Sequence, residues 1–270
     1  MSDHTDDIKE YYSDAQLEWD RLAGDFAHEK YITIHMMDRF LPGKGKILDI
    51  GGGPGHYSIH YAGKGYDVTL FDLSDENLVL AKKKAEESGV SIDTVRGNAL
   101  NLSGFRDEQF DAVFLMGPLY HLTDPESREK ALKEAVRVLS KGGYLFCSFI
   151  MTFGNVIYSL RNNAKAILED DERKHLDAIA DDQNLSFRPF SFTYAYETTV
   201  DDAKALIASN KDLSIETIFG QEGILAPYSS VLADMPEEQR LAWYDYSLKF
   251  CDKEEYLSHA EHLMVVSKKS

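Results

Sequence analysis

The chain has 270 residues, with 46 Asp and Glu against 29 Lys and Arg, so its formal net charge at pH 7 is −17. This charge argues against a nucleic-acid partner, because nucleic-acid binding depends on Lys and Arg side chains that neutralise phosphates. Hydrophobic residues make up 43% of the chain, which is ordinary for a globular protein with a real core. Since neither a repeat nor a flexible linker is evident, we expect one domain over residues 1–270.

The N-terminal seven residues, MSDHTDD, are acidic, whereas a signal peptide begins with basic residues followed by an apolar run. The longest apolar run, residues 144–151, is far too short to span a bilayer. Cys147 and Cys251 show no metal-binding spacing, and Cys147 falls in a predicted buried strand, which is typical of a reduced core thiol. These features predict a cytoplasmic protein without a membrane segment or a metal site.

Residues 8–41 are predicted to be helical, because their apolar side chains recur at steps of three and four residues. A second helix is expected over residues 25–40, where Pro42 and Gly43 end it. Because both helices precede the first predicted strand, residues 1–45 are expected to form a helical lid added to the sheet.

From residue 46 to residue 150 the pattern alternates between strands and helices. Strands are predicted at 46–50, 67–72, 91–95, 110–116 and 143–150, and helices at 55–64, 75–89 and 125–139. Ser74 and Asp124 are good N-caps for the second and third of these helices. The alternation predicts an α/β fold, a doubly wound Rossmann-like sheet whose ligand lies beyond the carboxyl ends of the strands.

The sequence KILDIGGGPGHYS, residues 46–58, is the stretch around which this core is organised. A strand, a glycine turn and a helix N-terminus form a cradle for a nucleotide-like ligand. The glycines are spaced G-x-G-x-G, whereas the dinucleotide fingerprint G-x-G-x-x-G would need glycine where His56 stands. Asp72 ends the next strand, where a carboxylate accepts hydrogen bonds from ribose hydroxyls. Both nucleotide classes share this acid, so Asp72 alone does not separate them.

Residues 47–57, 97–99 and 110–122 resemble, in order, motifs of class I S-adenosylmethionine-dependent methyltransferases. The strings GGGPG and GPLYHL together resemble a bacterial subfamily of small-molecule enzymes. The resemblance is dense over residues 46–150, the cofactor-binding core. It is thinner at Tyr11–Arg21, at Glu222-Gly223 and at His262–Lys268. It implies about seven strands with the last strand antiparallel, and S-adenosyl-L-methionine as the cofactor.

The resemblance implies cofactor contacts from Tyr11, Asp49, Gly51, Gly53, Asp72, Leu73, Asn98, Ala99, Met116 and Gly117. Asp49 and the glycine backbone would hold the amino-acid part, and Asp72 the ribose. Many family members carry Asp where Asn98 stands, although the Asn98 side-chain oxygen can accept from the adenine amino group. Tyr11 or Tyr12 would reach the cofactor from the lid, whose alternative role is that of a plain packing helix.

Tyr120 and His121 are the titratable residues nearest to the expected methyl group, which makes them candidates for catalysis. The alternative for His121 is a buried, hydrogen-bonded histidine that shapes the pocket. Gly117 stands where nucleic-acid amino-methyltransferases carry the Asp or Asn that accepts from a flipped base, which also argues against a nucleic-acid substrate. His175 and His259 are expected on the surface.

Residues 151–197 interrupt the alternation and are a candidate cap over the ligand edge, and the alternative is an aromatic face that packs on the domain. Two helices are expected, the second a charged one over 164–181, and then an aromatic strand near 187–196. Residues 198–270 are expected to complete the sheet, with a helix at 198–210, a strand at 213–219, a long helical region to about residue 259, and a strand at 263–267.

Together these features predict a cytoplasmic methyltransferase that acts on an O or N nucleophile of a small molecule by in-line displacement. A sulfonium leaving group departs neutral and needs no acid, so positioning is expected to supply most of the catalysis. We expect a monomer or a homodimer. The alternatives are a methyltransferase of tRNA or of a protein side chain, and a protein that binds the cofactor without transferring its methyl group. The glycine spacing disfavours a nicotinamide oxidoreductase.

Overall fold

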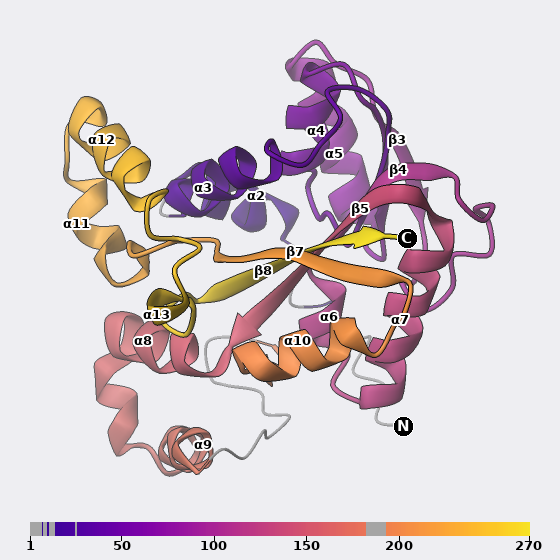
Figure 1. Cartoon of the computed structure of the whole chain (residues 1–270). Coiled ribbons are helices and arrows are strands. Elements are labelled where there is room, and N and C mark those ends of the chain that lie inside the picture. The colour runs from indigo at the N-terminus through magenta and orange to yellow at the C-terminus, as the bar shows by residue number, and fades with distance from the viewer. Residues whose placement is uncertain (1–6, 8–9, 11–13, 25, 182–192) are drawn as a thin grey trace.

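The computed structural model describes residues 7, 10, 14–24, 26–181 and 193–270, and the description below is confined to them. These residues form one sheet with helices on both faces (Figure 1). Its strands are β1 (Lys46–Ile50), β2 (Asp67–Asp72), β3 (Asp93–Arg96), β4 (Phe110–Leu115), β5 (Leu139–Met151), β6 (Glu197–Thr198), β7 (Leu213–Gly220) and β8 (His262–Lys269). The core strands therefore lie where the sequence pattern predicts them.

The strands follow the order β3-β2-β1-β4-β5-β8-β7, and the short β6 pairs with β5 outside this path. Strands β1 to β6 pair in parallel, whereas β8 runs antiparallel to both β5 and β7. This order confirms the predicted doubly wound sheet with an antiparallel last strand. The chain order reverses between β1 and β4, which is where open α/β sheets bind their ligands.

The helices are α2 (Ala15–Ala23), α3 (Ala27–Met37), α4 (His56–Gly63), α5 (Asp75–Glu87), α6 (Pro118–His121), α7 (Pro125–Val138), α8 (Thr152–Asn163), α9 (Asp170–Ala180), α10 (Val200–Ala208), α11 (Ser229–Ala233), α12 (Glu237–Ser247) and α13 (Glu254–Leu257). The predicted N-caps form: the Ser74 hydroxyl accepts from the Asn77 amide at 3.2 Å, and the Asp124 carboxylate accepts from the Ser127 amide at 2.9 Å. Local capping chemistry therefore fixes where α5 and α7 begin.

Two hydrophobic clusters sandwich the sheet, because successive side chains of a strand point to opposite faces. Ile47 of β1 packs in the cluster that contains side chains of α3, α4 and α5. The next residue, Leu48, packs in the cluster that contains side chains of α7 and α10. Figure 1 shows these two sets of helices on opposite sides of the strands. Cys147 is a buried free thiol in the second cluster, as predicted.

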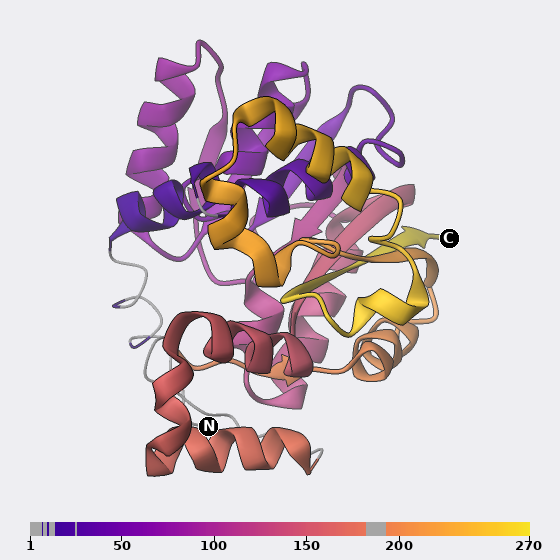
Figure 2. The same ribbon diagram turned by 90° about the vertical axis from the view of Figure 1, so that its left-hand side faces the viewer.

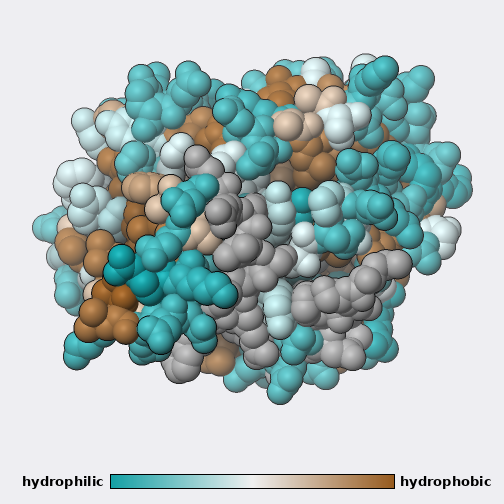
Figure 3. Space-filling view, turned by 90° about the horizontal axis from the view of Figure 1, so that it is seen from below, coloured by the Kyte–Doolittle hydropathy of each residue, from teal (hydrophilic) through white to brown (hydrophobic). Residues whose placement is uncertain are grey.

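The segment after β5 lies beyond the end at which the β5 arrow points, and Figures 1 and 2 both show α8 and α9 there. A 3₁₀ turn, η1 (Ala164–Leu168), joins these two helices. Most of the predicted aromatic strand lies outside the described residues, and of its tail only Thr193 to Tyr196 can be placed, just before β6. On this side, hydrophilic residues surround small separate groups of hydrophobic ones (Figure 3).

One prediction about this half of the chain is wrong. His175 is 2% exposed rather than on the surface, and its Nε2 lies 3.0 Å from the Glu197 carboxylate, which comes from β6. The long helical region predicted before β8 is confirmed, and it consists of a 3₁₀ turn, η2 (Ala226–Tyr228), followed by α11, α12 and α13. Pro227 and Pro236 stand at two of these starts, where proline is tolerated but a continuous helix is not. Within the described part of the chain, none of the helices has the length and apolarity needed to cross a bilayer.

Phe114 provides a test of the core. It is fully buried, and its ring lies 5.4 Å from the ring of Tyr61 and 5.3 Å from that of Phe146. Phe114→Ala should lower the free energy of unfolding by about 3–5 kcal/mol, because it removes buried apolar surface and leaves a cavity. Val79→Ala on the exposed side of α5, where Val79 is 70% exposed, should change it by less than about 0.5 kcal/mol. Equal effects in denaturant titrations would contradict this account of the core.

Candidate functional site

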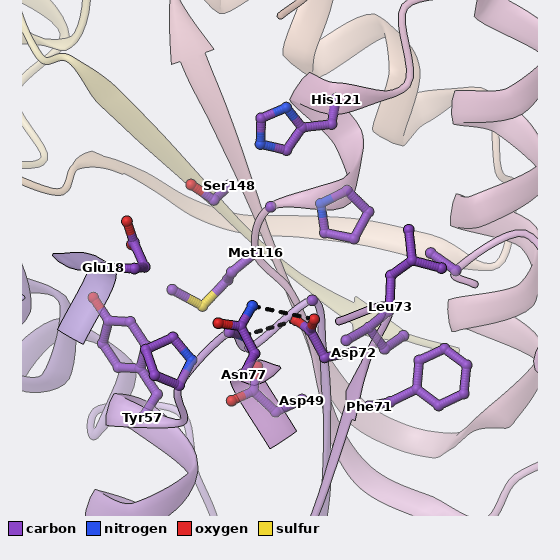
Figure 4. Close-up of a pocket in the computed structure, with 18 of the residues that line it drawn as sticks. Glu18, Asp49, Tyr57, Phe71, Asp72, Leu73, Asn77, Met116, His121 and Ser148 are labelled. Atoms are coloured by element: carbon purple, nitrogen blue, oxygen red, sulfur yellow. Dashed lines mark hydrogen bonds between the residues drawn. The ribbon is translucent and has the colours of Figure 1, made fainter. Parts of the chain in front are cut away.

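A pocket lies at the carboxyl ends of β1, β2 and β4, at the point where the strand order reverses. It brings together every described residue that the sequence predicted for the site: Asp49, Gly51, Gly53, Asp72, Leu73, Asn98, Ala99, Met116, Gly117, Tyr120 and His121. Tyr11 lies outside the described residues, so its contact stays a prediction. In Figure 4, Met116 lies between Asp49 and Asp72 on one side and Ser148 and His121 on the other.

The glycine turn after β1 has a backbone that other residues rarely adopt. Gly51, Gly53 and Gly55 have φ angles of +73°, +55° and +87°. At Gly51 there is also no room for a side chain, because an added Cβ would lie 2.6 Å from the Pro118 ring. The turn after β1 therefore packs directly against the turn after β4, and both present backbone to the pocket.

Asp72 connects the end of β2 to the glycine turn. One carboxylate oxygen accepts from the Gly53 amide at 2.9 Å, and the other from the Ser74 amide at 2.9 Å and the Asn77 side-chain amide at 3.3 Å. Burial raises the pKa of Asp72, and these hydrogen bonds oppose that shift. A carboxylate offers about four acceptor positions. Asp72 therefore keeps acceptor capacity for a ligand hydroxyl.

Asp49 is a buried carboxylate that is only half satisfied. Its Oδ2 accepts from the Ser58 hydroxyl at 2.7 Å, while Oδ1 has no hydrogen-bond partner within the described part of the chain. Burial raises the pKa of Asp49 to about 7, and the nearby Asp72 carboxylate adds to this rise. An unpartnered buried oxygen is costly, and a ligand that donates a hydrogen bond or carries positive charge would remove that cost. This observation fits the ammonium group of S-adenosylmethionine.

The loop after β3 closes the pocket beside β2. Gly97 packs so tightly that an added Cβ would lie 2.2 Å from the Phe71 ring. The Asn98 side-chain oxygen accepts from the Leu100 amide at 2.9 Å, which holds the loop in place. A carbonyl oxygen has a second lone pair, so this bond leaves one position for the predicted adenine contact. Phe71, Leu73 and Ala99 give this part of the lining an apolar character suited to a flat ring.

The short helix α6 carries both predicted catalytic candidates. His121 Nδ1 lies 3.0 Å from the Tyr194 carbonyl oxygen, and the Tyr120 carbonyl accepts from the Tyr196 amide at 2.7 Å. Burial lowers the pKa of His121 to about 4, despite the carbonyl bond that raises it, and burial raises the pKa of Tyr120. At pH 7 His121 is therefore neutral and a weak base. These contacts favour a shaping role for His121, and catalysis by either residue stays a prediction.

The sequence analysis missed a second set of polar residues at the pocket. Glu18, Arg21, Glu29, Ser148, Gln221 and His262 line it, and Glu222 lies next to Gln221. Arg21 contacts Glu29 at 2.8 Å and Glu18 at 3.1 Å. The only signal in the sequence was the thin resemblance at Tyr11–Arg21, Glu222-Gly223 and His262–Lys268, to which no function was attached.

Glu29, Glu222 and His262 each bring one ligand atom within 4.8 Å of the others, and all three take part in ion pairs within the protein. Glu29 is neutralised by Arg21. Both Glu222 oxygens are engaged: Oε1 lies 2.6 Å from His262 Nδ1, and Oε2 accepts from the Glu261 and His262 amides at 3.1 Å. Binding a cation here would require several of these bonds to break.

Comparison with known proteins agrees with this geometry. Residues 48–147 match the family model described as "Methyltransferase domain". An uncharacterised methyltransferase, YbaJ, of Bacillus subtilis is 37% identical over 114 residues, which cover 42% of this chain and 44% of that protein. A ubiquinone biosynthesis O-methyltransferase of Actinobacillus pleuropneumoniae is 38% identical over 109 residues, which cover 39% of this chain and 45% of that protein. The matches thus span less than half of these relatives.

Solved structures extend the likeness beyond the matched segment. A SAM-dependent methyltransferase from Methanosarcina mazei superposes with a TM-score of 0.57 at 20% identity, covering 87% of this chain and 96% of that one. A SAM-dependent methyltransferase from Thermotoga maritima, described as a possible histamine N-methyltransferase, gives 0.56 at 17% identity, covering 97% of this chain and 100% of that one. Residues 48–147 therefore match a methyltransferase domain, and the chain has the fold of S-adenosylmethionine-dependent methyltransferases.

Proposed function

We propose that this protein transfers a methyl group from S-adenosylmethionine to an O or N nucleophile of a small molecule. The observation that carries the proposal is a pocket with two chemically different ends at the switch point of the sheet. One end presents glycine backbone, Asp49 and Asp72. The other presents Ser148, Gln221 and His262, which a cofactor-binding module without transfer would not need.

At the first end, Asp49 would hold the ammonium group of the cofactor, and the backbone of Gly51 and Gly53 would face its amino-acid part. Asp72 would accept from the ribose hydroxyls, and Asn98 from the adenine amino group. When bound, the cofactor supplies an electrophilic methyl group on a sulfonium. The protein's task is then to align a nucleophile with that methyl group, and such positioning can contribute roughly 7–11 kcal/mol.

Helix α2 lies along the pocket. It contributes Glu18, Arg21 and Leu22 to the lining, and its Trp19 stacks on His56 with ring centroids 3.8 Å apart. The His56 Nε2 lies 2.8 Å from the Trp19 carbonyl oxygen, so the first residue of α4 fixes the position of α2. Covering the pocket in this way excludes water, which strengthens each polar interaction inside it.

A small acceptor is supported by two observations. The net charge of −17 disfavours RNA, and Gly117 lacks the side-chain acceptor that amino-methyltransferases of nucleic acids use. The name of the matched ubiquinone biosynthesis enzyme indicates an oxygen nucleophile in that relative. Incubation of metabolite extracts with methyl-labelled cofactor, followed by mass spectrometry, tests the proposal. Label appearing only in tRNA or protein would favour the alternative substrate class.

Asp72 provides the first test of the cofactor. We expect S-adenosylhomocysteine to bind and NAD not to bind. Asp72→Ala should weaken the binding of S-adenosylhomocysteine by about 1.5–3 kcal/mol, the range for hydrogen bonds to a charged group. The control is Asp75→Ala at the start of α5, whose exposed carboxylate pairs with Arg96 outside the pocket lining. Calorimetry in which NAD binds more tightly than S-adenosylhomocysteine would refute the assignment.

Asp49 predicts how cofactor binding depends on pH. An ammonium group beside Asp49 requires the carboxylate, so below the pKa of about 7 binding must displace a proton. The affinity for S-adenosylhomocysteine should therefore fall by up to about tenfold per pH unit below pH 7 and level off above it. Asp49→Asn should bind more weakly at pH 8 and lose this dependence. A variant that keeps the wild-type pH profile would show that another group causes it.

A further inference from the structure

The second end of the pocket is built around a pair of buried residues from two strand ends. Glu222 follows β7, which ends at Gly220, and His262 begins β8. Because β8 is antiparallel to β5, its first residue lies opposite Ile150, near the carboxyl end of β5. His262 thus lies at the same edge of the sheet as the glycine turn after β1 and helix α6 after β4. Its ring centroid lies 6.2 Å from that of Tyr120.

Glu222 fixes the orientation of the His262 ring. It is fully buried, and the two backbone amides on Oε2 hold it as a carboxylate whose Oε1 faces Nδ1 of His262 at 2.6 Å. Nδ1 is committed to Glu222, and among the described residues the hydrogen bonds of the His262 ring all involve this nitrogen, so that Nε2 is left open. The ring itself lines the pocket. An imidazole held by a carboxylate at one nitrogen and open at the other is arranged for proton transfer.

The charges around His262 come from several elements. From α2 and α3, Arg21 and Glu29 form an ion pair, and His28 is kept neutral because burial lowers its pKa. Behind the ring, Glu261 is bound by Arg161 of α8 at 3.1 Å. Burial lowers the pKa of His262, but the carboxylates of Glu222 and Glu29 outweigh burial and the opposing Arg21, and they raise it to about 9. His121, at about 4, is the far weaker base.

We propose that His262, oriented by Glu222, accepts the proton of a phenol-type hydroxyl on the methyl acceptor. This inference rests on the proposed function. The O–H bond of the acceptor breaks, its proton passes to Nε2, and its electron pair stays on oxygen. That oxygen bonds the methyl carbon as the C–S bond of the sulfonium breaks, with the C–S electron pair remaining on sulfur. Nε2 then returns its proton to solvent. Glu222 is a positioning residue, and His262 the catalytic base.

The chemistry of the pair selects the acceptor. A phenol has a pKa of about 10, close to that of His262, so proton transfer between them is nearly balanced. A carboxylate acceptor would meet Glu222, Glu29 and Glu18, which outnumber the neighbouring Arg21 when His262 is unprotonated and ready to act as a base. A neutral hydroxyl meets no such repulsion. The class that fits is therefore a small phenol or catechol rather than a carboxylic acid.

The test uses the full chain, S-adenosylmethionine, and phenol and catechol as acceptors. Only unprotonated imidazole accepts a proton. The value of kcat/KM should therefore rise about tenfold per pH unit and level off near pH 9, which gives the profile an acid limb set by His262. Glu222→Gln should shift that limb to lower pH, in step with the His262 pKa measured by NMR on histidine-labelled protein. His262→Asn should lower kcat by about 10²–10⁴ and remove the limb, with S-adenosylhomocysteine affinity unchanged. His259→Asn, an exposed histidine outside the pocket, is the matched control.

Distinct outcomes overturn the proposal. If His262→Asn keeps kcat within threefold of the wild-type value, His262 is not the catalytic base. The same conclusion follows if the pH profile of kcat/KM for Glu222→Gln stays in place while the His262 pKa falls. If His262→Asn does not fold, circular dichroism shows it, and Glu222→Gln decides alone. If the enzyme binds S-adenosylhomocysteine and labels metabolites in extracts but methylates neither phenol nor catechol, the proposal is overturned and the proposed function stays intact. Absence of cofactor binding would instead overturn the proposed function itself.

Discussion

The close approach of two backbone turns is the constraint on which the site depends. The turn after β1 and the turn after β4 meet where the strand order reverses, and Gly51 lies so near Pro118 that a Cβ would not fit. Left-handed φ angles at Gly51 and Gly53 allow the turn to bend back before α4 begins. The amide of Gly53 then reaches Asp72 at the end of β2. The carboxyl ends of β1, β2 and β4 are thus held close together, and the pocket lies between them.

Electrostatics differ between the two ends of this pocket. Asp49 and Asp72 are buried near each other, and no ion pair joins either of them to a cation among the described residues, so burial and the charge of Asp72 raise the pKa of Asp49. At the other end every carboxylate has a partner: Glu29 has Arg21, and Glu222 has His262. A low-dielectric site tolerates buried charge only when it is paired or hydrogen-bonded. Among the described residues, Asp49 Oδ1 at the first end has no such partner, whereas Glu29 and Glu222 at the second end are paired.

Segments far apart in the chain enclose these two ends. Helix α2 is fixed by the stacking of Trp19 on His56, and α6 is fixed by backbone contacts to the segment that precedes β6. The same segment leads to Glu197, which pairs with His175 of α9. The predicted cap region is therefore linked to α6 by backbone hydrogen bonds and to β5 through β6.

The sequence by itself determined the features that depend on near neighbours in the chain. The strand and helix order, the caps at Ser74 and Asp124, and the glycine turn follow from periodicity and local hydrogen bonding. Asp49 and Asp72 could be predicted as site residues, because the carboxyl ends of parallel strands meet at one edge of a sheet.

Only the tertiary structure decided which distant polar residues meet. Glu222 and His262 are 40 residues apart, and they come together because β8 returns antiparallel between β5 and β7. The burial of His175 was not predicted for the same reason, since its partner Glu197 lies on β6 rather than on α9. Hydrophobic periodicity shows which face of an element is buried, but it carries no information on which polar side chain will face it. That pairing is set by strand order and register, which the sequence pattern does not encode locally.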